Sequence, residues 1–384
     1  MITNNKKYEL TIVIIFFFTW GILFMDRLVI SFIMPVIQPE LGLTNSDVGM
    51  IGFVTTITYG ISSVVIGILS DRIGYKKRIL LPLIFGAGLF SGLGVVVTSF
   101  DQLLVVRALV GLCEGPVAPL LFSMLFYTNK DNFGRNCGIL NASVGAIAIT
   151  VGPVFVTQLV ANYSWQFTFL LSSLPTFVMF VLVAIFVKET KLDDIAKTDK
   201  SERSLVKILA VFKYRNIILC CLICFFTLCA YWTLMLFNSL YLVNIVGMTV
   251  QNAGFVIASM GLLNILYSVV WPKLADIFGR KPILGIGLLL CMGGPIGLFL
   301  SQNMGGAYMY IAFGGMLSAV IPLFMTMIPM ETVPVIYATT VGAFITGIGD
   351  LFGPSTITEA DSWKGALVVT NARWKSILHP TTGK

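Results

Sequence analysis

The chain consists of long apolar stretches separated by short polar connections. Eleven stretches of about twenty residues carry almost no charge, and a helix of that length crosses the hydrocarbon core of a bilayer. The predicted spans lie at roughly residues 10–34, 47–69, 79–99, 103–126, 138–160, 166–187, 217–243, 251–271, 282–300, 306–329 and 334–353. The first follows two lysines, as a signal peptide would, but it is too long and lacks a small-residue cleavage site, so we interpret it as a retained helix. The pattern predicts an all-α membrane protein.

Basic residues collect in alternate connections. Nineteen of the 25 Lys and Arg residues lie before the first span or in every second connection, eight of them between Lys188 and Arg215. The opposite connections, at 35–46, 100–102, 161–165, 244–250 and 301–305, contain none. Cytoplasmic loops carry an excess of Lys and Arg. We therefore expect a multi-pass protein of the plasma membrane, the inner membrane in a bacterium, with a cytoplasmic amino terminus.

The two halves of the chain share landmarks at a nearly constant offset, as in transporters built from duplicated halves. The matching pairs are Asp71 with Asp276 and Gly74 with Gly279, both 205 residues apart, and Gly152 with Gly353 and Pro153 with Pro354, both 201 apart. This repeat predicts four regions: an N-terminal six-helix bundle (1–187), a cytoplasmic linker (188–215), a C-terminal bundle (216–354) and a polar tail (355–384).

Composition narrows the functional class. Hydrophobic residues make up 57% of the chain and charged residues 11%, whereas a soluble domain averages about 25% charged residues. No nucleotide-binding loop, GxSxG elbow or HExxH motif is present, and Cys221 and Cys224 lack the second cysteine pair of a zinc site. The net charge of +7 comes from short clusters between spans, which does not fit a nucleic-acid binder. We expect no enzyme activity, cofactor or metal.

The connection after the second span reads GILSDRIGYKKR (67–78). It resembles the signature loop of the major facilitator superfamily, and KLADIFGRKP (273–282) resembles its degenerate second copy. The resemblance implies two bundles with twelve helices in all, and a conformational role for the motif residues: Gly67, Asp71, Arg72, Gly74, Asp276, Gly279 and Arg280. An Asp near a helix end can pair with Arg side chains and helix amino termini of the other bundle. The alternative is a plain basic loop.

Two further segments narrow the resemblance. MDRLVISFIMP (25–35) in the first span and RALVGLCEGP (107–116) in the fourth are similar to segments of the anion:cation symporter branch, which includes bacterial sugar-acid transporters and the sialin group. The branch implies a small organic anion carried with protons by alternating access. Its sugar-acid members have a substrate-contacting Tyr at the position of Tyr59. Asn238 and Ser239 stand where relatives often have Trp-Leu-Pro, which leaves the identity of the substrate open.

Ionisable residues inside the spans are few: Asp26, Arg27, Arg107, Glu114 and Asp350. Each costs about 2.5 to 3.5 kcal/mol in a bilayer on insertion scales, so it needs a partner or a task. Arg107 and Glu114 are two helical turns apart and share a face, whereas the neighbours Asp26 and Arg27 point about 100° apart. The resemblance implies that Arg27 binds a substrate carboxylate, Asp26 and Glu114 take up and release protons, and Arg107 tunes Glu114. The alternative is two structural ion pairs, Asp26 with Arg27 and Arg107 with Glu114.

Other polar and aromatic residues are weaker candidates for the wall of a cavity: Tyr59, Asn141, Tyr231, Trp232, Asn238 and Asn264. A sugar acid needs hydroxyl partners together with apolar faces, although such side chains in membrane helices more often serve in packing and interhelical hydrogen bonds. Of these we assign substrate binding, beside Arg27, to Tyr59, Asn141, Trp232 and Asn238. Asp350 could join the proton pathway, cap a kinked helix or face water.

We predict a secondary active transporter for a sugar acid or other carboxylate, coupled to protons and monomeric in the bilayer, with no nucleic-acid partner. The alternatives are an organophosphate or drug antiporter of the same superfamily, a transporter-like sensor, and a truncated product that does not transport. The last alternative arises because residues 357–384 are too polar to cross a membrane. The twelfth helix is therefore expected to be missing or degenerate, which leaves about five helices in the second bundle and places the carboxy terminus on the outer face.

Overall fold

The computed structural model describes residues 6–73, 75–129, 132–189, 213–300, 304–332 and 345. Its first half contains the helices α1 (Lys6–Glu40), α2 (Asn45–Ile73), α3 (Lys76–Gly92), η1 (Leu93–Val96), α4 (Phe100–Glu114), α5 (Val117–Thr128), α6 (Phe133–Ser143), η2 (Val144–Val151), α7 (Gly152–Asn162) and α8 (Trp165–Phe186). Several spans are thus built from two or three consecutive helices. The break between α4 and α5 falls at Pro116, which has no N–H to donate, and η2 is a π-helical turn between α6 and α7.

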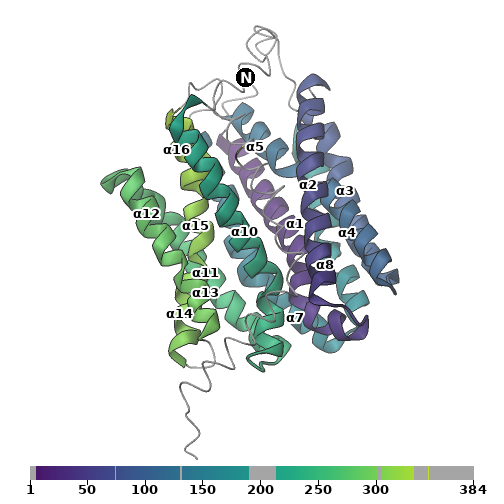
Figure 1. Cartoon of the computed structure of the whole chain (residues 1–384). Helices are drawn as coiled ribbons and strands as arrows, with labels where there is room; N and C mark the ends of the chain where they lie inside the picture. Colours follow the sequence, from purple (N-terminus) through teal and green to yellow (C-terminus); the bar gives the residue numbers. More distant parts are fainter. Residues whose placement is uncertain are drawn as a thin grey trace, which may run out of the picture.

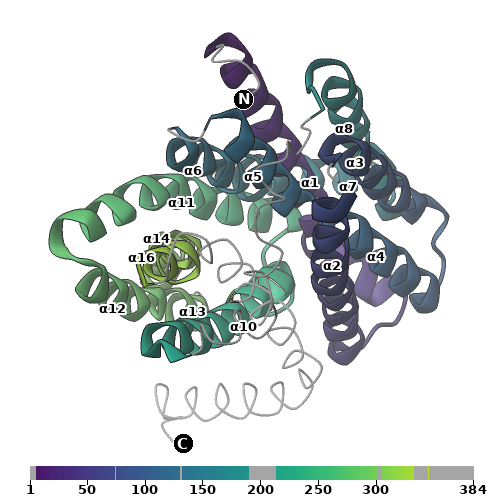
Figure 2. The same cartoon turned by 90° about the horizontal axis from the view of Figure 1, so that it is seen from above.

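The second half contains α10 (Arg215–Asn244), α11 (Val250–Phe278), α12 (Arg280–Cys291), α13 (Gly293–Phe299), α14 (Met304–Gly314), α15 (Met316–Pro322), η5 (Leu323–Met327) and α16 (Ile328–Thr332). The helices run roughly along one direction (Figure 1). Seen along that direction, α10 to α16 lie on one side and α2, α3, α4 and α8 on the other, with α1 reaching the boundary (Figure 2). The two-bundle architecture predicted above is confirmed.

Within the described residues, nine helical segments are long and apolar enough to cross a membrane, and they coincide with the first nine predicted spans. The tenth predicted span corresponds to the shorter helices α14 to α16. Several predicted features lie outside the described residues. They are the eleventh predicted span apart from Ile345, most of the linker, Asp350, and the tail, where the twelfth helix is predicted to be missing or degenerate.

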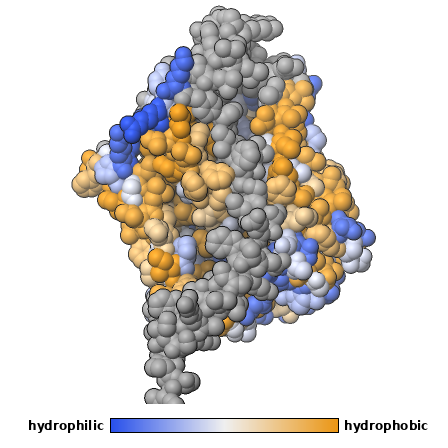
Figure 3. Space-filling model, viewed as in Figure 1, coloured by the Kyte–Doolittle hydropathy of each residue, from blue (hydrophilic) through white to orange (hydrophobic). Residues whose placement is uncertain are grey.

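The sides of the molecule are apolar, as a membrane protein requires. Large hydrophobic side chains such as Val65, Ile185, Phe226 and Leu289 are more than half exposed. Figure 3 shows hydrophobic residues covering the flank, with hydrophilic residues gathered towards the two ends. Exposed apolar surface on this scale is unfavourable in water, whereas lipid tails solvate it.

The helices differ in how they begin at the two ends of the molecule. We call the end at which α1 begins the amino-terminal end, and the opposite one the far end. At the far end the first backbone N–H groups are capped by short hydroxyl side chains: Thr44 for α2, Ser99 for α4, Ser164 for α8 and Thr249 for α11. Such caps satisfy donors that a helix leaves unpaired. Chain reversal at this end is therefore encoded locally.

At the amino-terminal end, α3 is capped by a residue distant in sequence. Glu189 accepts backbone hydrogen bonds from Lys77 at 2.9 Å and Arg78 at 3.2 Å. The neighbouring Lys188 donates its backbone N–H to the hydroxyl of Tyr8 at the start of α1. The residues that follow α8 thus join the first turns of α1 and α3.

The structure adds a third landmark to the internal repeat. Gly42 and Gly247 both adopt positive φ angles, +63° and +81°, in the connections before α2 and α11, and they are 205 residues apart. Thr44 and Thr249, the caps of those two helices, have the same offset. Positive φ favours glycine because it has no Cβ. The two halves therefore share a turn as well as a motif.

The hydrophobic core is divided along α1. Its residues from Met25 to Ile37 belong to one cluster with buried residues of α10 and α11. Its residues from Ile12 to Leu23 belong to a second cluster whose other members come from α3, α5, α6 and the α8 region. Among the described residues, the two bundles therefore share a core in the far half only.

Candidate functional site

Two glycines, Gly111 in α4 and Gly115 directly after its last residue, set the distance between α4 and α2. A Cβ at Gly111 would overlap the carbonyl oxygen of Thr55, and one at Gly115 would overlap that of Tyr59. Small residues four apart allow membrane helices to approach backbone to backbone. The Ser62 hydroxyl lies 3.4 Å from the Gly111 carbonyl and donates to it. This approach places Glu114 beside the middle of α2.

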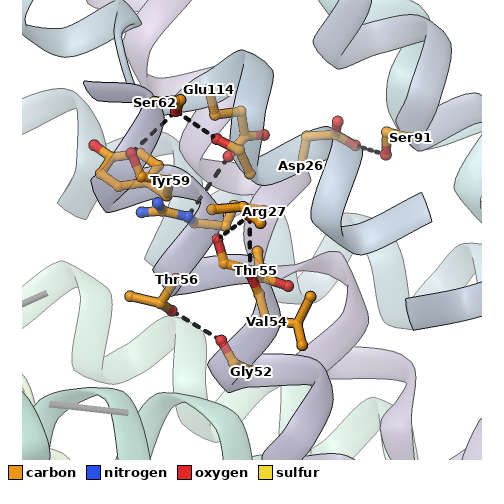
Figure 4. A network of polar contacts seen from close by, with 12 residues as sticks. Asp26, Arg27, Gly52, Val54, Thr55, Thr56, Tyr59, Ser62, Ser91 and Glu114 are labelled. Carbon is orange, nitrogen blue, oxygen red and sulfur yellow. Dashed lines mark hydrogen bonds and ion pairs between the residues drawn. The ribbon is translucent and has the colours of Figure 1, made fainter. Parts of the chain in front are cut away.

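Arg27 of α1 projects into the same place. Its Nε lies 3.5 Å from Oε2 of Glu114, and both side chains are buried. The Arg27 guanidinium carbon lies 3.7 Å from the ring centroid of Tyr59, so the cation rests on the ring face. Figure 4 shows Arg27, Glu114 and Tyr59 converging. Among the described residues, Nη2 of Arg27 and Oε1 of Glu114 have no hydrogen-bond partner, which leaves capacity for a ligand.

Asp26 points away from this group, into the N-terminal bundle. Its Oδ1 accepts a 2.8 Å hydrogen bond from the hydroxyl of Ser91 on α3, and the side chain is fully buried (Figure 4). Its second oxygen has no partner among the described residues. Arg27 therefore lies at the boundary between the bundles, whereas its neighbour Asp26 lies in the interior of the N-terminal bundle.

Arg107 is also fully buried. Its guanidinium carbon lies 4.5 Å from the ring centroid of Phe169 on α8, and its three guanidinium nitrogens have no hydrogen-bond partner in the described parts of the chain. It attracts both Asp26 and Glu114 electrostatically. The contacts differ from the two ion pairs considered as the structural alternative, because Glu114 pairs with Arg27 and Asp26 bonds to Ser91.

A cavity of about 40 Å³ lies beside Arg27, between the two bundles. Helix α1 contributes Arg27 and Ser31, α2 contributes Thr55 and Thr56, and α10 contributes Trp232, Met235 and Leu236. The Trp232 ring lies 5.0 Å from the Arg27 guanidinium. We call this set of residues the central site.

The other residues predicted to line a cavity lie elsewhere. Asn238 accepts a hydrogen bond from the hydroxyl of Tyr310 inside the C-terminal bundle, and Asn264 donates to the Gly315 carbonyl at 2.7 Å. Asn141 is exposed on α6. Tyr231 is buried and packs edge-on against Trp232. Of the predicted set, the structure brings only Tyr59 and Trp232 to Arg27.

For the residues of the signature loop and its second copy, the structure describes mainly the backbone. Gly67 lies in α2, Asp71 and Arg72 lie in its last turn, and Asp276 lies in the last turn of α11. Gly279, which precedes Arg280 at the start of α12, has a φ of +93°, which explains glycine there. Gly74 and the side chains of Asp71, Arg72 and Asp276 lie outside what the structure describes. The conformational role of the motif stays a prediction.

Sequence reasoning missed three kinds of contact. Ser91 and Phe169, which contact Asp26 and Arg107, stand in ordinary apolar stretches and gave no signal. Thr55 and Thr56 looked like neutral positions in a long apolar helix.

The described residues include no group of three or more His, Cys, Asp or Glu side chains able to hold a metal ion.

Comparison with known proteins places this site in a family. The family model described as Major Facilitator Superfamily matches residues 13–355. The chain is 30% identical over 179 residues to the hexuronate transporter of Bacillus subtilis (strain 168), an alignment that covers 46% of this chain and 42% of that protein. It is 28% identical over 169 residues to the "Probable L-galactonate transporter" of Escherichia coli (strain K12), covering 44% and 37%. The chain thus aligns with less than half the length of either relative.

The chain also resembles a protein with a different named function, and a solved structure at lower sequence identity. The multidrug resistance protein MdtG of Escherichia coli O17:K52:H18 is 29% identical over 177 residues, covering 45% of this chain and 43% of that protein. A crystal structure of a bacterial homolog of the human lysosomal transporter Spinster, in an inward-facing and unoccupied conformation, matches with a TM-score of 0.79 at 17% identity, covering 98% of this chain and 87% of that one. That likeness shows the fold. The chain belongs to the major facilitator superfamily of membrane transporters.

Proposed function

We propose that the chain is a secondary active transporter that carries a small organic carboxylate together with a proton. The observation that supports this most directly is the buried contact of Arg27 with Glu114 at the boundary of the two bundles. An Arg in a dry cavity stays charged and presents its planar fork to a carboxylate. Relatives that transport hexuronate and are named for L-galactonate transport have substrates of this class.

Charge balance at the site links the anion to a proton. The central region buries two cations, Arg27 and Arg107, and two carboxyl groups, Asp26 and Glu114. With both carboxylates ionised the group is neutral, so an incoming anion adds one uncompensated negative charge. Isolated buried charge is strongly unfavourable. Protonation of one carboxylate restores neutrality, which makes anion and proton bind together.

Glu114 is the carboxylate that we assign to this exchange. A substrate carboxylate that binds Arg27 competes with the Glu114 oxygen now 3.5 Å from it. Once Glu114 loses that contact, its uptake of a proton at Oε2 removes the unpaired charge. Asp26, bonded to Ser91, is the second proton-binding group, and Arg107 attracts both carboxylates.

We assign the amino-terminal end to the cytoplasmic side of a bacterial inner membrane, because the basic connections support that orientation. The bundles share a hydrophobic core in the far half, so we assign closure of the outer side to these contacts. Rocking of one bundle against the other about the central site would then expose Arg27 to each side in turn.

The test is uptake by proteoliposomes containing the purified chain, with radiolabelled carboxylates and an imposed proton gradient. We expect an acidic exterior to drive uptake, Arg27→Ala to abolish it, and Arg215→Ala, an exposed Arg at the start of α10, to leave it unchanged. Glu114→Gln, which mimics the protonated state, should keep exchange of labelled for unlabelled substrate while losing acceleration by the gradient. Normal uptake by Arg27→Ala would refute the assignment.

Drug export is the competing function, favoured by the similarity to a multidrug resistance protein. The central site argues against cationic drugs, because Arg27 lines the cavity and Glu114 is engaged with it. Counterflow separates the remaining possibilities, since a sensor binds a carboxylate without exchanging label. Export of a cationic dye that Arg27→Ala leaves intact would favour the drug transporter.

A further inference from the structure

Three aromatic rings surround the guanidinium of Arg27. Its carbon lies 3.7 Å from the ring centroid of Tyr59, 5.0 Å from that of Trp232 and 5.6 Å from that of Phe24. Phe24 and Trp232 also stack on one another, with centroids 6.3 Å apart and ring planes 18° from parallel. Cations are attracted to ring faces. The cation of the central site therefore has an aromatic wall.

These rings belong to different bundles. Phe24 and Tyr59 come from α1 and α2, whereas Trp232 comes from α10. The cavity beside Arg27, which Trp232 lines and which measures about 40 Å³, is smaller than the roughly 150 Å³ that accommodates a benzene molecule in a protein core. A substrate therefore enters only when α10 moves away from α1. That movement separates Trp232 from Phe24 and exposes the faces of both rings to the substrate.

Polar side chains that could bind the hydroxyl groups of a sugar are committed within the protein. Asn238 accepts from Tyr310, and Asn264 donates to the Gly315 carbonyl at 2.7 Å. Ser239 donates to the Phe32 carbonyl at 3.2 Å, a bond between the bundles. Recruiting any of them would leave a buried polar group without its partner, which is unfavourable.

The hydroxyl groups that do line the cavity offer little more. Thr55 and Thr56 donate to the carbonyls of Ile51 and Gly52 in their own helix, at 2.7 Å and 2.9 Å. Their oxygens can still accept a hydrogen bond, but their protons are used. Met235 and Leu236 make the opposite wall apolar. A polyhydroxy chain needs several donors and acceptors along its length, whereas beside Arg27 the described lining adds few donors, among them the Ser31 hydroxyl.

Building on the carboxylate transport proposed above, we propose that the substrate is a planar aromatic or heteroaromatic monocarboxylate. Its carboxylate binds Arg27, whose Nη2 has no hydrogen-bond partner among the described residues. Its ring packs against Trp232 and the apolar side chains of α10, and where the ring carries a hydroxyl or N–H, that group donates to Thr55 or Thr56. Within the described lining Arg27 is the one cation, which suits a single carboxylate.

The first experiment measures equilibrium binding by calorimetry on the full chain in detergent. The probes are benzoate, nicotinate, gluconate and galacturonate, with neutral benzamide as the control for charge. We expect benzoate and nicotinate to bind at least tenfold more tightly than the two sugar acids, and benzamide not to bind. Tighter binding of gluconate or galacturonate would overturn this inference and leave the proposed carboxylate transport standing. Absence of binding by every carboxylate would overturn both.

The second experiment tests the ring of Trp232. Trp232→Leu should weaken benzoate binding about fivefold to tenfold, the range of a specific aromatic contact, and Trp232→Phe should restore most of the loss. Phe226→Leu, which removes a lipid-facing ring from the same helix, should leave benzoate binding unchanged. Gel filtration verifies that each variant is folded. Unchanged benzoate affinity in a folded Trp232→Leu variant would overturn the inference.

Discussion

Replacing Glu9 by glutamine tests how the first helix is fastened at the amino-terminal end. The Glu9 carboxylate accepts four hydrogen bonds from the end of α5 and the start of α6, and the side chain is almost fully buried. The donors and distances are Asn129 Nδ2 at 2.7 Å, Asn132 Nδ2 at 2.9 Å, Asn136 Nδ2 at 2.9 Å and Arg135 Nη2 at 3.0 Å. One carboxylate thereby joins α1 to the connection between the fourth and fifth spans.

The magnitude follows from the nature of these bonds. Glutamine has a single acceptor oxygen, so its NH₂ group would take the place of the other carboxylate oxygen. That group would face either Asn129 or the other three donors, and donors facing an NH₂ group lose their acceptor. A buried donor left unsatisfied costs about 1–3 kcal/mol, and charge-assisted bonds are roughly twice as strong as neutral ones. The Arg135 contribution is small, because that side chain is 64% exposed. We expect Glu9→Gln to destabilise the chain by about 2–4 kcal/mol.

Thermal unfolding in detergent, followed by a thiol-reactive dye, measures the effect. From the unfolding entropy per residue and the 384 residues of the chain, the expected loss lowers Tm by roughly 2–5 °C. Arg135→Ala is the matched control, since it removes one partner of the same carboxylate from an exposed position, and its Tm should fall by no more than about 1 °C. If Glu9→Gln and Arg135→Ala lower Tm equally, the buried asparagine bonds do not fasten α1.

Three further predictions concern packing around the central site. Gly111→Val should lower stability by about 1–3 kcal/mol, because any Cβ there meets the Thr55 carbonyl oxygen. Gly138→Ala should not lower stability, because there is open space around Gly138. Denaturation in detergent compares the two variants. Phe169→Leu should slow proton-driven uptake twofold to tenfold by removing the ring beside Arg107; an unchanged rate would show that the ring does not hold that cation. Ser239→Ala should weaken closure of the far end by about 0.5–1.5 kcal/mol, since its hydroxyl joins α10 to the Phe32 carbonyl. Faster deuterium uptake in residues 32–48 would be the readout, and unaltered exchange would contradict it.

The spans and the charges within them could be read from the sequence because each depends on a short segment. A stretch of about twenty apolar residues is helical in a bilayer whatever surrounds it, since its backbone must bond to itself. The nine segments found in the described residues match the predicted ones for that reason. An ionisable residue in such a stretch is costly wherever it lies, so Asp26, Arg27, Arg107 and Glu114 stood out in advance.

Which of these groups meet depends on the packing of the helices. Glu114 pairs with Arg27, Asp26 bonds to Ser91, and Arg107 rests on Phe169. These partners come from different helices, so their contacts depend on how each helix is rotated and how closely it approaches its neighbours. The approach of α4 to α2 at Gly111 is one such determinant. Asn238 shows the converse: its residue type suited a substrate contact, and the packing of its helix makes it the acceptor of the Tyr310 hydroxyl.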